Sequence, residues 1–107
     1  MAKSLQTFEL QVLVAMLRQR GETYSVPLVL ELEKRAGRRV APAAVFIALG
    51  RLEAKGLVAS RLDAAESGRT RRYVKLTRRG LAVVRAHQVE HARLWRGLAA
   101  VLRTPRS

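Results

Sequence analysis

The chain has 107 residues, 49% of them hydrophobic and 27% charged, which predicts one small globular domain and excludes a disordered or multidomain chain. Lysine and arginine outnumber aspartate and glutamate by 21 to 8, and the resulting charge of +13 points to a polyanionic partner. The sequence has no cysteine, which excludes disulfides, thiolate catalysis and cysteine-rich zinc sites.

The first part of the chain carries two helical patterns. Residues 5–20 have apolar side chains at intervals of three and four, which predicts a helix that stops at Gly21. Ser25 can cap a second helix, with Pro27 in its first turn, where a missing N–H group costs little. We expect this second helix to run to about Ala36.

A third helix is predicted to follow Pro42. Its inward stripe is Val45, Leu49 and Leu52, and Gly56 stands where a left-handed C-terminal cap belongs. Gly50 inside the helix costs on the order of 1 kcal/mol relative to alanine.

The apolar period then changes from helical to alternating. Residues 57–62 and 70–76 read as two strands, and the turn formers between them favour a hairpin. Thr77 can cap a last, long helix over about residues 78–102. Three helices followed by a two-stranded ribbon and a helix predict a mainly α fold with a small β hairpin, which is the winged helix-turn-helix arrangement.

Three stretches of the chain resemble the PadR family of bacterial transcriptional regulators. They are LQTFELQVLVAML, YSVPLVLELEKRAGRRVAPAAVFIALGRLEAKGLV and GRTRRYVKLTRRG, and the resemblance covers roughly residues 5–82. It implies a homodimeric DNA-binding repressor of the compact form, with a single helix after the wing that makes much of the dimer interface. Phe46 and Ala41 stand where the family usually has a tyrosine and often has a serine.

On this interpretation residues 1–77 form the DNA-binding domain and residues 78–107 the dimerisation helix and tail, packed as one unit. The outward face of the third helix has few of the side chains that read base edges. We therefore expect recognition through thymine methyl groups, DNA shape and the wing. Phe46 and Ile47 could instead contact the core or a partner. The candidate DNA-binding residues of this helix are Pro42, Ala43, Ala44, Phe46, Ile47 and Arg51.

Basic residues flank this helix on both sides. Arg69, Arg71 and Arg72 lie near the predicted wing tip and are candidates for phosphate or minor-groove contact. Arg38 and Arg39 precede the third helix and either contact phosphate or only promote solubility.

The last helix carries an apolar row that a domain of this size cannot cover, which predicts a second copy as its partner. The candidate dimerisation residues are Leu81, Val84, His91, Leu94, Trp95, Leu98, Val101 and Leu102. Trp95 packs in the interface or stacks a small hydrophobic ligand. His87 and His91 have a spacing that can hold a metal ion, but no further ligand completes a site, and polar residues at the dimer seam are the favoured interpretation.

No catalytic motif, cofactor motif, signal peptide or membrane span stands out in the sequence, so we expect a cytoplasmic protein that is not an enzyme. Two alternatives to a regulator remain open at this stage. The chain could be an architectural protein that binds nucleic acid without sequence preference. It could also be a winged-helix module that binds an acidic protein.

Overall fold

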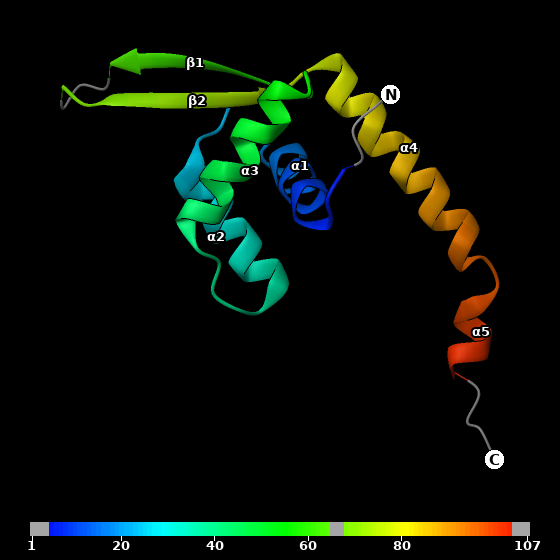
Figure 1. Cartoon of the computed structure of the whole chain (residues 1–107). Helices are drawn as coiled ribbons and strands as arrows, with labels where there is room; N and C mark the ends of the chain where they lie inside the picture. Colours follow the sequence, from blue (N-terminus) through cyan, green and yellow to red (C-terminus); the bar gives the residue numbers. More distant parts are fainter. Residues whose placement is uncertain (1–4, 65–67, 104–107) are drawn as a thin grey trace.

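The computed structural model describes residues 5–64 and 68–103 and is mainly helical with one antiparallel hairpin (Figure 1). This arrangement confirms the predicted winged helix-turn-helix. In chain order the elements are α1 (Thr7–Gln19), α2 (Ser25–Ala36), α3 (Pro42–Ala54), β1 (Val58–Ala64), β2 (Thr70–Leu76), α4 (Arg78–Trp95) and α5 (Leu98–Arg103).

The core lies where α1, α2 and α3 meet the base of the hairpin. Each helix contributes the apolar stripe expected from its periodicity, and β2 adds one fully buried residue. The least exposed of these side chains are Val12, Leu13, Met16, Leu28, Val45, Leu52 and Val74. The core therefore fixes which face of α3 is left for solvent or a ligand.

Of the two side-chain caps predicted at the starts of α4 and α2, the structure has the first and lacks the second. Thr77 caps α4 as predicted, because its Oγ1 accepts a hydrogen bond of 3.0 Å from the Gly80 N–H. Ser25 was expected to cap α2, and this expectation is wrong. The N-cap is Tyr24, whose backbone is extended, whereas Ser25 is already inside the helix and no side chain caps this end.

The wing is an antiparallel ribbon in which Ser60 pairs with Val74 and Asp63 with Arg71. A third segment joins it, because Thr23 and Val74 exchange two backbone hydrogen bonds of 2.9 and 2.8 Å. This bridge ties the residues before α2 to the base of β2. Residues 65–67, within the predicted turn, lie outside the described residues.

The helix α4 leaves the hairpin at a point of very close contact. A β-carbon at Gly80 would lie 2.1 Å from the carbonyl oxygen of Leu57, so only glycine fits there. The Thr77 hydroxyl also donates to the Gly56 carbonyl at 2.8 Å. These backbone contacts set the direction in which α4 runs.

The prediction of one helix over residues 78–102 is wrong. The helix α4 ends at Trp95, and a short second helix of six residues follows. Gly97 between them has φ of +80°, a left-handed conformation that an α-helix cannot include.

The C-terminal helices extend beyond the three-helix body, on the side away from the wing (Figure 1). The radius of gyration is accordingly 16.5 Å, whereas a compact chain of this length would have about 13 Å.

Candidate nucleic-acid interface

The exposed face of α3 is apolar. Phe46 and Ile47 are 58% and 56% exposed, so neither belongs to the core, and contact with DNA or with a protein partner stays open. Ala43 and Gly50 lie on the same face and are also exposed. A large aromatic and a branched aliphatic side chain in water indicate a surface that contacts another molecule.

Hydrogen bonds to neighbouring elements hold Arg51 of α3 and the loop that precedes the helix. Arg51 Nη1 donates to Gln6 Oε1 at 3.2 Å, so this arginine is turned toward the chain just before α1. The loop before α3 is fixed by a hydrogen bond of 2.9 Å from the Val40 N–H to Glu33 Oε2. Arg38 and Arg39 project from this loop into solvent.

The two faces of the wing differ, as the alternation of β2 predicts. Val74 is buried against the helices, and Arg72 on the same face reaches toward α3. The guanidinium carbon of Arg72 lies 6.0 Å from the centroid of the Phe46 ring. The basic wing and the apolar face of α3 therefore belong to one continuous surface.

The outer face of the wing carries a row of arginine and tyrosine side chains. The guanidinium of Arg71 lies over the Tyr24 ring at 4.2 Å, and that of Arg61 lies over the Tyr73 ring at 4.8 Å. The two tyrosine rings meet edge to face, with centroids 6.0 Å apart. We call these four residues the arginine–tyrosine row.

Only one arginine of the row is neutralised by the described carboxylates. Arg61 binds Glu22 through two hydrogen bonds of 2.7 and 2.8 Å and Asp63 through one of 3.0 Å, and these contacts raise its pKa. A side-chain hydrogen bond with Tyr73 raises the pKa of Arg71. Both arginines are therefore positively charged at neutral pH, but the charge of Arg71 is not offset by a described acid.

The sequence indicated Arg71 as a candidate but not the aromatic residues that hold it. Tyr24 lies in the short segment before α2, and only the bridge between Thr23 and Val74 brings it beside the wing. An isolated tyrosine after a glycine and a glutamate gives no signal of this contact. A hollow of about 290 Å³ lies next to it, between the start of α2, α3 and β2.

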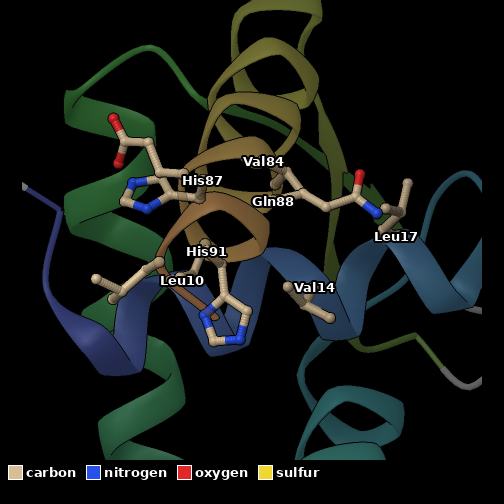
Figure 2. A pocket seen from close by; sticks show the side chains of 9 residues that line it. Leu10, Val14, Leu17, Val84, His87, Gln88 and His91 are labelled. Carbon is tan, nitrogen blue, oxygen red and sulfur yellow. The ribbon is translucent and has the colours of Figure 1, made fainter. Parts of the chain in front are cut away.

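A second hollow, of about 540 Å³, lies between α1 and α4 (Figure 2). Leu10, Val14 and Leu17 line it from α1, while His87 and His91 are among the residues that line it from α4. The imidazole of His91 also stacks on Trp95, with ring centroids 5.6 Å apart. Within residues 5–64 and 68–103 no group of three or more potential metal ligands comes together.

The predicted dimerisation residues divide into two groups. Leu81 and Val84 are half-buried, and Val84 packs against the protein's own core. The others project from the end of α4 and from α5, where Leu94 is 75% exposed. The exposed members are His91, Leu94, Trp95, Leu98, Val101 and Leu102.

Comparison with known proteins identifies relatives of the fold. The sequence profile of the Transcriptional regulator PadR-like family matches residues 12–86. No curated protein sequence matches the chain. Among the helices of the described residues, none is both long enough and apolar enough to span a membrane.

Several solved structures share the fold over most of the chain. A PadR family transcriptional regulator from Eggerthella lenta is 27% identical, with a TM-score of 0.70 over 92% of this chain and 89% of that one. RosR from H. salinarum is 23% identical, with a TM-score of 0.73 over 91% and 83%. A PadR-like transcriptional regulator from Bacillus cereus is 20% identical, with a TM-score of 0.74 over 92% and 93%. The last two likenesses concern the fold alone.

Proposed function

Because the chain belongs to the PadR-like family of transcriptional regulators, we propose that it is a repressor that binds operator DNA as a homodimer. Each subunit places α3 in a major groove and its wing on the adjoining backbone. The protein acts by binding rather than by catalysis, in the cytoplasm.

One observation carries this proposal: the basic wing and the exposed face of α3 form one surface. Arg72 of the wing lies 6.0 Å from the ring of Phe46 on α3, and Arg69 and Arg71 line the hollow beside them. Residues 67–107 hold eleven basic residues and one acidic residue, so this part of the chain has few acidic residues to neutralise its positive charge. Such a surface suits DNA, in which negatively charged phosphates lie beside apolar groups at the edge of a groove.

The chemistry of α3 indicates how sequence would be read. Phe46, Ile47 and Ala43 can contact thymine methyl groups, whereas Arg51 already hydrogen-bonds Gln6. The remaining discrimination comes from DNA shape and from the wing. We therefore expect an operator rich in A·T pairs, and we expect affinity to fall when its thymines are replaced by uracil.

The homodimer is supported by the exposed apolar residues on α4 and α5. Leu94, Trp95, Leu98, Val101 and Leu102 are all between 39% and 75% exposed, and they follow one another along an extended arm. The groove between α1 and α4 offers an apolar seat for the same residues of a second copy. Trp95 packs in that interface, and a small hydrophobic ligand beside it would change the angle between the subunits.

The same apolar face on α3 favours a second candidate, an architectural protein that binds DNA without sequence preference. Competition at physiological salt separates the two functions. The test compares a duplex selected from a random library with a duplex of unselected sequence. A regulator should prefer the selected duplex by about 10³ or more, whereas a preference below about tenfold identifies an architectural protein. A chain that binds neither duplex is not a DNA-binding regulator.

A further inference from the structure

We propose that Arg71 is a preorganised anchor for a DNA backbone phosphate and that Tyr24 and Tyr73 are positioning residues that hold it. The inference rests on the DNA binding proposed above and adds to it a defined site outside α3. The site lies at the start of α2, where the arginine–tyrosine row ends.

The charge of Arg71 is not neutralised within the described residues. Asp63 pairs with Arg71 in the register of the hairpin and is the described acid nearest to it along the strands. Its carboxylate, however, accepts a hydrogen bond of 3.0 Å from Arg61, which also donates two hydrogen bonds to Glu22. Arg71 therefore keeps its charge for an external anion, and within the described residues no carboxylate forms an ion pair with it.

The side chain of Arg71 is also held in place by its neighbours. An exposed arginine normally samples many rotamers and loses this freedom when it binds a phosphate. The guanidinium of Arg71 is instead stacked over the Tyr24 ring at 4.2 Å, and Tyr24 is held edge to face by Tyr73. The stack on the ring face and the side-chain hydrogen bond with Tyr73 restrain the guanidinium plane, and no described carboxylate occupies its N–H groups.

Space for a ligand lies beside Arg71. The hollow of about 290 Å³ beside Arg71 opens between the wing and the starts of α2 and α3. A phosphate in this hollow would lie near several N–H donors and a hydroxyl group. Two parallel hydrogen bonds from one guanidinium match the geometry of the phosphate oxygens. The lining residues that matter are Tyr24, Ser25, Phe46, Arg69, Arg71 and Arg72. Since Phe46 belongs to α3, the anchored phosphate lies beside the groove that α3 enters.

The test is a double-mutant cycle on binding of the full chain to the selected and the unselected duplex. Arg71→Ala should weaken binding to both duplexes by about tenfold or more, because a phosphate contact carries no base preference. The slope of log K against log salt should become shallower by about 0.9 for each subunit. Tyr24→Leu should weaken binding by about threefold, and Tyr24→Phe, which keeps the ring, should restore it.

The cycle separates a positioning role from a structural one. In the Arg71→Ala background, Tyr24→Leu should have no further effect on affinity. An equal effect in both backgrounds would overturn the proposal, as would wild-type affinity of Arg71→Ala. Arg85→Ala is the matched control, because it removes the same charge from an exposed position on α4, outside the wing.

A further variant covers the case in which Tyr24→Leu does not fold. Arg71→Lys keeps the charge but loses the planar stack, so it should bind severalfold more weakly than wild type. Wild-type affinity of this variant would also overturn the proposal. If the wild-type chain binds neither duplex, the DNA-binding function itself is refuted, and that outcome is distinct from failure of the anchor.

Discussion

The ammonium group of Lys55 lies 2.5 Å from Oε1 of Glu9, and the Glu9 side chain is only 2% exposed. The pair joins the C-terminal end of α3 to the first turn of α1. Oε1 of Glu9 also accepts a hydrogen bond of 3.0 Å from the Gln6 N–H. An ion pair with a buried carboxylate thus ties the C-terminal end of α3 to α1.

Breaking this pair on one side should destabilise the fold strongly. Lys55→Met leaves the buried Glu9 carboxylate without its nearest cation, and we expect a loss of about 3 kcal/mol in the free energy of unfolding. Urea unfolding measures it. The double variant Glu9→Leu with Lys55→Met removes both charges and should recover much of the loss. If the two single losses simply add in the double variant, the pair is not coupled.

The same pair should make stability depend on pH. Burial alone would raise the pKa of Glu9, but the hydrogen bonds from Lys55 and Gln6 and the nearby positive charges lower it below 4.5 overall. The stabilisation is therefore complete above about pH 4.5 and is lost as the pH falls through the lower pKa of the folded state. Unfolding free energies of wild type and Glu9→Gln, measured across this range, should converge toward low pH. A constant difference would contradict the expectation.

Gly80→Ala should disrupt the junction of the hairpin and α4. The added β-carbon would lie 2.1 Å from a backbone oxygen, so the two backbones must separate. We expect a loss of about 2 kcal/mol or more and a fall in Tm of roughly 10 °C. Thermal unfolding followed by circular dichroism tests this, with Gly50→Ala as the control glycine substitution. An unchanged Tm for Gly80→Ala would mean that the contact is not close in solution.

Gly50→Ala should separate stability from DNA binding. A β-carbon at this position of α3 meets no atom within 4 Å, so the helix should gain about 0.5 to 1 kcal/mol. Gly50 also lies on the face with Phe46 and Ile47, which we propose contacts DNA. We expect a higher Tm together with weaker binding to the selected duplex. A gain in stability with unchanged affinity would place Gly50 outside the interface.

Leu94→Asp should convert the proposed dimer to a monomer. The substitution places a charge in the exposed apolar row of α4, whereas Ala86→Asp places the same charge at an exposed position outside that row. Light scattering at micromolar concentration should report a monomer mass for the first variant and a dimer mass for the second. The fluorescence of Trp95, the one tryptophan of the sequence, should shift to the red in Leu94→Asp alone. A monomeric wild type would overturn the dimer.

Residues 78–103 form two helices, α4 and α5, where the sequence predicts one. The apolar row continues on both sides of Gly97, so periodicity predicted one helix across it. Instead α4 ends at Trp95, because Arg96 leaves the helical conformation with ψ of 127° and Gly97 follows with a left-handed φ, before α5 begins at Leu98. The prediction was wrong because apolar periodicity shows only which face of a helix is apolar. It does not show how strongly a single residue destabilises the helix.

The sequence by itself determined the order of helices and strands as far as the start of α4, the face of α3 that is buried, and the side of β2 on which Val74 packs. These features follow from periods of 3.6 and 2 residues, which depend only on local backbone geometry. The tertiary structure alone decided the partners of three arginines. Arg51 binds Gln6, Arg61 binds Glu22, and Arg71 stacks on Tyr24. Each arginine is far from its partner in the sequence. A long charged side chain can contact many residues, and the packing of the helices determines which of them lies within reach.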